Sequence, residues 1–358
     1  MKHQTQIKKI SFKGKDFFIG IDVHKKTWYV SIRHNSLLIK SFATEPEPYI
    51  LYNFLNKNYP HANFFVVYET GRFGFWIYRE FQKLGIKCMV VNPADIPSTH
   101  KEKDKKSDKI DSHKLARELE NNNLRPIFVP SEEAQHLRSL VRLYLTYTKN
   151  ITRTKNQIKS FLDYNGINLP KHTSSWSNNF ITYLYSITID NNGPGDKTLY
   201  SLLDTLCFLR KEQNKILKQI RLFIKNSSFK QTFDLLRTVP GIGFKIGIIV
   251  LSEIIDMNRF KNFDQLKSYV GLTPSVYSSG NTYYEYGLTY RKNSRLKYAL
   301  IEASWVAIRK DPVLLETYNK LITRMKKQQA IIRIAKKLLS RIRYVWLNQK
   351  PHVIGVVE

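Results

Sequence analysis

Short apolar runs separated by mixed segments make up the first ninety residues. Residues 17–23, 28–33 and 37–42 are β-rich and close enough together to form a three-stranded meander. The pattern that follows predicts a helix opened by Pro46 and Pro48 and running through Leu55, a strand over 64–68, a helix over 73–84 and a strand over 86–91. This order predicts an α/β domain with a mixed sheet. It fits a ribonuclease-H-like fold better than a dinucleotide-binding fold, since no G-x-G-x-x-G follows the first strand.

Helical periodicity dominates the middle of the chain. Apolar side chains recur at helical spacing over residues 131–164, and a second long helix is predicted over about 198–224. The segment between them, 166–195, has an irregular pattern broken by Gly193-Pro194-Gly195. Two long helices with such an interruption predict a coiled-coil-like arm, and simple packing helices are the alternative.

The last third of the chain is again predicted to be mainly helical. It contains the sequence Pro240-Gly241-Ile242-Gly243 between two helical stretches, a loop over 277–291 and a basic helix over about 316–346. We therefore expect three domains: an α/β domain over 1–125, a helical arm over 126–228 and a helical domain over 229–358.

The net charge of the chain indicates which kind of partner it binds. The sequence holds 58 Lys and Arg against 29 Asp and Glu, a formal net charge of +29, which attracts polyanions. Nucleic acid is the expected partner and a membrane surface the rival. The chain shows no apolar run of membrane-spanning length, no apolar leader in its first fifteen residues, and two cysteines. We therefore expect a soluble, cytoplasmic prokaryotic protein without a disulfide framework or zinc cluster.

Carboxylates at the predicted strand ends and at one helix start are the candidate chemistry. Asp22 ends the first strand and Glu69 ends a later one. Asp108 and Asp111 lie three residues apart at a helix start and so share a face. Oxygen donors of this kind suit Mg²⁺. Two such ions about 3.5–4 Å apart can clamp the attacking and leaving oxygens of a phosphodiester.

Each of these acids also has an ordinary explanation. An acid at a strand end is commonly a solvated turn residue, and Asp108 and Asp111 suit the first turn of any helix. The combination is more informative, because these acids stand in a strongly basic chain. It predicts a metal site formed by Asp22, Glu69, Asp108 and Asp111.

Glycines and basic residues are the candidate nucleic-acid contacts. The helix–Gly241-x-Gly243–helix pattern resembles a helix-hairpin-helix, in which backbone N–H groups hold a phosphate and Lys245 adds charge. A tight helix–helix turn is the alternative. The basic positions of the long helix and of residues 326–343 are further candidates, with a solvated basic face as the alternative. The nucleic-acid contacts predicted outside the glycine turn are Arg138, Arg142, Arg153, Lys159 and Arg291.

A serine before glycine, Ser279, stands in a loop rich in Tyr, Ser and basic residues. Serine in such a loop is a candidate nucleophile on phosphate, and Ser278 is the fallback. An ordinary Ser-Ser-Gly loop is the alternative reading of this segment.

Taken in order, these pieces resemble a known family, the insertion-sequence transposases with an N-terminal DEDD, RuvC-like domain and a C-terminal serine-bearing domain, the bridge-RNA-guided recombinases. The resemblance covers nearly the whole chain and rests on the following motifs: Gly20-Ile21-Asp22-Val23, Glu69-Thr70-Gly71, Val91-Asn92-Pro93, Lys106-Ser107-Asp108-Lys109-Ile110-Asp111, Pro240-Gly241-Ile242-Gly243, Arg259-Phe260, Gly271-Leu272-x-Pro274 and Ser279-Gly280. The chain departs from the family pattern at Ser107, Asn281, Lys292 and Lys297, none of which is a catalytic group.

The resemblance implies a composite site. In it, Asp22, Glu69, Asp108 and Asp111 carry over as the DEDD metal ligands and Ser279 as the nucleophile that attacks a DNA phosphate. It also implies donor and target DNA as partners, a noncoding guide RNA that pairs with both, and a homotetramer assembled through the helical arm. Two other functions remain open: a metal-dependent structure-specific nuclease or resolvase that does not use Ser279 as a nucleophile, and a non-catalytic nucleic-acid-binding protein such as a decayed transposase.

Overall fold

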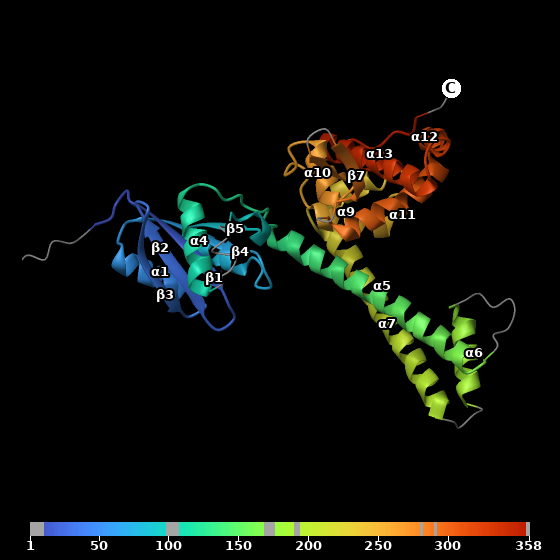
Figure 1. The fold of residues 1–358 in the computed structure, drawn as a ribbon. Helices are drawn as coiled ribbons and strands as arrows, with labels where there is room; N and C mark the ends of the chain where they lie inside the picture. The colour runs from blue at the N-terminus through green and yellow to red at the C-terminus, as the bar shows by residue number, and fades with distance from the viewer. Residues whose placement is uncertain are drawn as a thin grey trace, which may run out of the picture. The chain divides into compact units, whose positions relative to one another are not determined.

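The computed structural model describes residues 11–97, 107–167, 176–189, 194–279, 282–289 and 292–355 (Figure 1). Contacts between residues divide the chain into two compact units, 1–129 and 130–358. A separate arm domain over 126–228 stays a prediction. Among the helices of the described residues, none has the length and apolar character that a membrane crossing requires.

A five-stranded sheet is the centre of unit 1. Its strands are β1 (Asp16–Val23), β2 (Trp28–His34), β3 (Leu37–Thr44), β4 (Asn63–Glu69) and β5 (Lys87–Val91), in the order β3-β2-β1-β4-β5. The first three strands form an antiparallel meander, while β4 runs parallel to β1 and β5 runs parallel to β4. The predicted mixed sheet of ribonuclease-H-like type is confirmed.

Alternation along the strands gives the sheet two apolar faces. On one face, α1 (Pro48–Asn58) and α2 (Trp76–Lys83) share a core with alternate residues of the strands, such as Ile19 and Ile21 of β1. On the other face, α4 (Asp108–Glu120) packs against β1, β2 and β4. Leu115 of α4 joins a smaller core there with Val67 of β4. A short 3-10 helix, η1 (Pro93–Asp95), follows β5.

Gly20 of β1 is the point where α4 comes closest to the sheet. A Cβ atom at Gly20 would lie 2.1 Å from the carbonyl oxygen of Ser112 and 2.5 Å from the backbone nitrogen of Ala116. Beside it, the hydroxyls of Ser31 on β2 and Ser112 lie 2.8 Å apart, within hydrogen-bond distance. The backbone of α4 therefore rests directly on the backbone of β1, which only a glycine permits.

A buried ion pair fixes the far end of the same helix. Arg33 of β2 donates from Nε to the Glu120 carboxylate at 2.7 Å, and both side chains are about nine-tenths buried. The other carboxylate oxygen of Glu120 accepts a hydrogen bond from the backbone nitrogen of Ser36 at 2.7 Å. With Gly20 under its middle and Arg33 at its end, α4 has one orientation over the sheet, and its N-terminus lies over the carboxyl end of β1.

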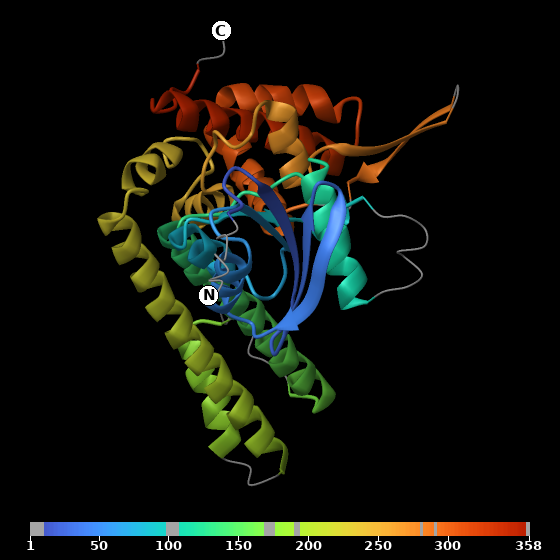
Figure 2. The same ribbon diagram turned by 90° about the vertical axis from the view of Figure 1, so that its left-hand side faces the viewer.

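Unit 2 begins with two 33-residue helices, α5 (Glu132–Tyr164) and α7 (Pro194–Asn226), which lie side by side (Figures 1 and 2). The prediction that residues 166–195 are irregular was wrong for its second half, where α6 (Asn178–Ile189) packs against α7. This helix is rich in β-branched and aromatic residues, which favour strands in isolation. It is stabilised by burial of Phe180, Ile181 and Leu184 in the core that α5 and α7 share.

The rest of unit 2 is a bundle of shorter helices. They are α8 (Lys230–Leu236), α9 (Phe244–Ile254), α10 (Phe263–Val270), α11 (Ser294–Lys310), α12 (Pro312–Ile322) and α13 (Lys327–Asn348). One continuous helix over 316–346 was therefore a wrong prediction. The chain turns after α12, where the backbone nitrogens of Arg324 and Met325 both donate to the carbonyl of Leu321.

The predicted loop over 277–291 was also wrong for most of its length. It contains an antiparallel hairpin of β6 (Pro274–Ser279) and β7 (Thr282–Leu288), which projects from the helices of unit 2 (Figure 2). The sequence signal for such a hairpin is Gly280-Asn281 flanked by tyrosines, Tyr277 before it and Tyr283, Tyr284 and Tyr286 after it.

Replacement of Gly20 by Ala should destabilise unit 1 by about 3 kcal/mol, because the new methyl group overlaps backbone atoms of α4 that have no room to move. The measurement is urea unfolding followed by circular dichroism. Gly71→Ala is the matched control, since a Cβ atom there meets nothing within 4 Å. Equal stability of the two variants would show that the close contact at Gly20 is not needed.

Candidate metal centre

Two acids stand side by side at the carboxyl end of the sheet. β1 and β4 are parallel with Ile21 opposite Tyr68, so the residues that follow, Asp22 and Glu69, are neighbours on adjacent strands. Gly20 lies under α4, and side chains two residues apart on a strand share a face. Asp22 and Glu69 therefore lie on the face of the sheet that α4 covers.

The N-terminus of α4 brings the other two acids to this edge. Ser107 caps the helix by accepting a hydrogen bond from the backbone nitrogen of Ile110 at 3.3 Å. Asp108 and Asp111 fall in the first turn, where negative charge suits the helix dipole. The Asp108 side chain is 62% exposed and that of Asp22 is 24% exposed, so the pair is open to solvent on one side.

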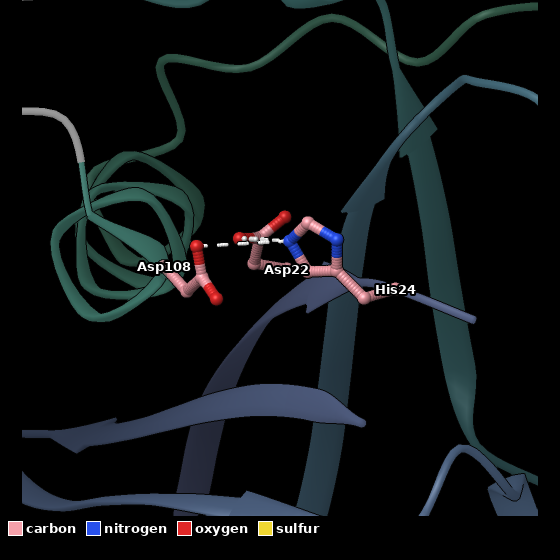
Figure 3. Close-up of side chains that lie close together, drawn as sticks. All are labelled: Asp22, His24 and Asp108. Carbon is pink, nitrogen blue, oxygen red and sulfur yellow. Dashed lines mark hydrogen bonds and ion pairs between the residues drawn. The ribbon is translucent and has the colours of Figure 1, made fainter. Parts of the chain in front are cut away.

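His24 joins Asp22 and Asp108 (Figure 3). Its Nε2 lies 3.1 Å from Oδ2 of Asp22 and 3.7 Å from Oδ1 of Asp108. One ligand atom from each of these three residues lies within 4.8 Å of the others. The sequence prediction missed His24. Its position two residues after Asp22, on the same face of an extended chain, is the only signal for it.

Asp22 has an altered acidity in this setting. Burial raises the pKa of its carboxyl above the ordinary value, and the neighbouring charges of Asp108 and Asp111 act in the same direction. His24 opposes them through its charge and its hydrogen bond to Asp22. The Asp22 carboxyl therefore lies close enough to Asp108 and Asp111 to be affected by both of their charges.

The donor set fits a divalent cation. Asp22 and Asp108 offer hard carboxylate oxygens, the ligands that Mg²⁺ and Mn²⁺ prefer, and the imidazole nitrogen of His24 is a ligand that transition metals accept. Asp111 interacts electrostatically with Asp22, and Glu69 stands beside Asp22 on the next strand. Neither belongs to the group of three whose ligand atoms converge among the described residues.

Comparison with known proteins agrees with this architecture. A DEDD-type transposase model of the IS110 group matches residues 19–165, and the model described as "Transposase IS116/IS110/IS902 family" matches residues 233–319. The chain belongs to the IS110/IS116 family of transposases. The first match spans the strand ends and α4, and the second spans the glycine turn and the β6–β7 hairpin.

Named relatives of this transposase family member are similar over much of the chain. The putative transposase y4qE of Sinorhizobium fredii is 28% identical to this chain, and the match covers 66% of this chain and 57% of that protein. The putative transposase y4rJ of the same organism is 27% identical over 82% of this chain and 79% of its own length. The transposase of insertion sequence IS1533 from Leptospira borgpetersenii is 24% identical over 68% of this chain and 71% of its own length.

Arg138 and Arg142, which the sequence predicted as nucleic-acid contacts, donate hydrogen bonds within the protein. Arg142 makes a bidentate pair with the buried carboxylate of Glu253, at 2.9 and 3.0 Å. Arg138 donates to the backbone carbonyls of Ser252 and Glu253 at the end of α9. Both arginines join α5 to α9, and their contact to nucleic acid stays a prediction.

Asn293 completes the surroundings of Glu253. Its side-chain nitrogen donates to the Glu253 carboxylate at 2.8 Å. Tyr269 donates its hydroxyl to the carbonyl of Glu253 at 2.9 Å. The backbone nitrogen of Asn293 also donates to the carbonyl of Tyr269. This hydrogen bond joins the two ends of the segment that carries the β6–β7 hairpin. Burial acts to raise the pKa of Glu253, but the hydrogen bonds from Arg142 and Asn293 outweigh it and hold the pKa below its ordinary value.

The remaining predicted nucleic-acid contacts lie on the surface or outside the described residues. Arg153 and Lys159 are exposed on α5. Burial lowers the pKa of the neighbouring Lys155, and the charges of Arg210 and Lys159 lower it further, so positive charge is concentrated on this stretch of the arm. Ser279 ends β6, and Arg291 lies outside the described residues.

The lowered pKa of Glu253 predicts that unit 2 becomes less stable in acid. Because its folded pKa lies below the unfolded value, it stabilises the fold at neutral pH, and that stability is lost as pH falls from about 4.3, the unfolded value, through the folded pKa. Glu253→Gln should cost about 3 kcal/mol at pH 7, and the difference from wild type should shrink below pH about 4. Urea unfolding at several pH values measures it.

The control for this titration is Glu316→Gln, which removes an exposed carboxylate paired with Lys320 on α12. This change should have little effect at any pH. A stability difference between wild type and Glu253→Gln that stays constant from pH 7 to the acid limb would contradict the assignment.

Proposed function

We propose that this chain catalyses the cleavage and strand exchange of insertion-sequence DNA, with a divalent cation held between the carboxyl end of β1 and the N-terminus of α4. The observation that carries the proposal is the approach of Asp22, His24 and Asp108 from two segments more than eighty residues apart in sequence. Membership of the IS110/IS116 family supports the reaction class.

In this proposal Asp22 and Asp108 bind the metal ion directly. Asp111 and Glu69 lie nearby and are proposed as further ligands. A bound Mg²⁺ supplies Lewis-acid stabilisation of charge on a phosphodiester. His24 is held by both aspartates, so it either adds a nitrogen ligand or positions the two carboxylates. The open side of the pair, where Asp108 is most exposed, is where a DNA phosphate would approach.

Ser279 is the proposed nucleophile. Its hydroxyl oxygen forms a bond to phosphorus while the bond from phosphorus to a sugar oxygen breaks. The serine proton leaves to a base, and the released sugar oxygen gains a proton. One phosphoester replaces another, so the bond energy is kept for rejoining. Support comes from its place as the last residue of β6, at the tip of a projecting hairpin (Figure 2), and from the family resemblance of the motif around it.

Loss of a metal ligand should abolish DNA cleavage. Asp108→Asn keeps the size of the side chain and removes its charge, and it should lower Mg²⁺-dependent cleavage by more than the about 10–100-fold typical of an outer-shell change. Glu80→Gln on α2, which covers the opposite face of the sheet, is the matched control and should cleave normally. Cleavage of labelled DNA on a denaturing gel measures both. Normal cleavage by Asp108→Asn would contradict a metal site here.

Loss of Ser279 should abolish the covalent intermediate. Wild-type protein with Mg²⁺, flanking noncoding RNA, and donor and target DNA should form a denaturant-resistant protein–DNA adduct that Ser279→Ala lacks. Ser278→Ala is the neighbouring control and should retain the adduct. If Ser279→Ala still cleaves DNA and no variant forms an adduct, the chain is a metal-dependent nuclease. If no protein, wild type included, cleaves DNA, it is a non-catalytic binder.

The same reaction tests the proposed assembly. The acids lie in unit 1 and Ser279 in unit 2, so a composite site can draw them from one subunit or from two of a homotetramer. Mixed Asp108→Asn and Ser279→Ala subunits recover activity only if the two groups meet between subunits. A guide RNA is proposed as the second polyanion, bound along the basic stretch of the arm that includes Arg153 and Lys159.

A further inference from the structure

A groove lies around the turn between α8 and α9. Its volume is about 630 Å³, and its walls come from α7, the turn itself, the start of α9, the end of α11 and Ile354 near the C-terminus. All of these elements belong to unit 2, whereas the candidate metal centre lies in unit 1.

Four positive side chains line this groove, each from a different element. They are Arg221 of α7, Arg237 at the end of α8, Lys245 of α9 and Lys310 of α11. All four are exposed, and no acidic residue lines the groove with them. In the part of the chain that the structure describes, none of the four forms an ion pair. Positive charge gathers here without a carboxylate to neutralise it, which is the arrangement expected of a polyanion site.

Backbone donors add to this charge. Gly243 caps α9 without any side-chain hydrogen bond, and the first-turn residues Phe244, Lys245 and Ile246 all line the groove. The turn itself is pressed onto α11, since Gly241 has φ +87° and a Cβ atom there would lie 2.4 Å from the carbonyl oxygen of Ala303. The turn is therefore held firmly against α11, whose last residue is Lys310.

Apart from its four cations, the groove offers little that would recognise one base over another. The Arg221 guanidinium lies over the ring of Phe244 at 4.3 Å, and Phe233 packs against the same ring in a T-shaped pair, so Phe244 is already engaged and poorly placed for the base stacking that single strands require. Thr238 already donates its hydroxyl to the Leu235 carbonyl and accepts from the backbone nitrogen of His352. What remains is positive charge and N–H donors, the chemistry of phosphate contact.

We propose that this groove binds the backbone phosphates of duplex DNA without reading its sequence. The groove then positions DNA on unit 2, and it does so without metal or chemistry at Asp22 and Asp108. The proposal extends the glycine-turn prediction, Gly241, Gly243 and Lys245, by three side chains that no sequence motif indicated: Arg221, Arg237 and Lys310.

The salt dependence of binding tests the proposal. Full-length protein is titrated with a duplex of arbitrary sequence in EDTA, so that a failed metal site leaves the result unaffected. Arg237→Gln combined with Lys310→Gln should lower the slope of log affinity against log salt concentration by about 2, because each lost phosphate contact removes about 0.9. The control is Lys218→Gln with Lys225→Gln, two exposed lysines of α7 outside the groove.

A pair of substitutions at Gly243 separates binding from folding. A Cβ atom at Gly243 meets nothing within 4 Å and φ is −80°, so larger residues fit. Asp and Asn are both favoured helix caps and should preserve or raise thermal stability. Gly243→Asp places a negative charge among the four cations and should bind duplex DNA more weakly than Gly243→Asn.

Each of the following results would overturn the proposal: a salt slope of the groove double variant equal to that of the α7 control, equal affinities of Gly243→Asp and Gly243→Asn, or a loss confined to single-stranded DNA or to RNA while duplex DNA binds as before. A loss of affinity on one duplex sequence alone would equally contradict binding without sequence readout.

Discussion

The contact between Gly20 of β1 and the backbone of α4 is the constraint on which the candidate site depends. No side chain separates strand and helix there, since a Cβ atom would lie 2.1 Å from the Ser112 carbonyl oxygen. The Arg33–Glu120 pair then holds the far end of the helix over β2. With both points fixed, the capped N-terminus of α4 has one place to lie, beside the end of β1. Asp108 and Asp22 are therefore brought together by backbone packing and not by mutual attraction, which two carboxylates do not have.

In unit 2, the buried carboxylate of Glu253 holds distant segments together. Glu253 ties Arg142 of the arm to Asn293, next to the β6–β7 hairpin, and its neighbouring carbonyls take up Arg138. An acid in a strongly basic chain thus joins the base of the arm to the segment that bears Ser279. Among the described residues, no carboxylate pairs with the four cations that line the groove at the glycine turn: Arg221, Arg237, Lys245 and Lys310. Pairing with Glu253 thus distinguishes the arginines that hold the fold from the groove cations that we propose contact DNA.

The sequence predicted those elements whose formation depends on neighbouring residues in the chain. The strands of unit 1 follow from apolar runs, and Asp22, Glu69 and Asp108 could be placed at strand ends and at a helix start because those ends are marked in sequence. His24 was missed because its place two residues after Asp22 does not by itself distinguish it from a solvated histidine. The pairing of Arg142 with Glu253 spans 111 residues and depends on tertiary packing alone. The break between α12 and α13 has no Gly or Pro to mark it, and α6, whose residues favour strands, is stabilised by its burial.

The central claim is that Asp22 and Asp108, held together by α4 packing on Gly20, share a divalent cation. Crystals of the full chain grown with Mn²⁺ test it directly through the anomalous scattering of the ion. The account predicts an anomalous peak bound by carboxylate oxygens of both Asp22 and Asp108, with His24 bound to it or hydrogen-bonded to its ligands. A map with both carboxylates ordered and no Mn²⁺ between them would contradict the account.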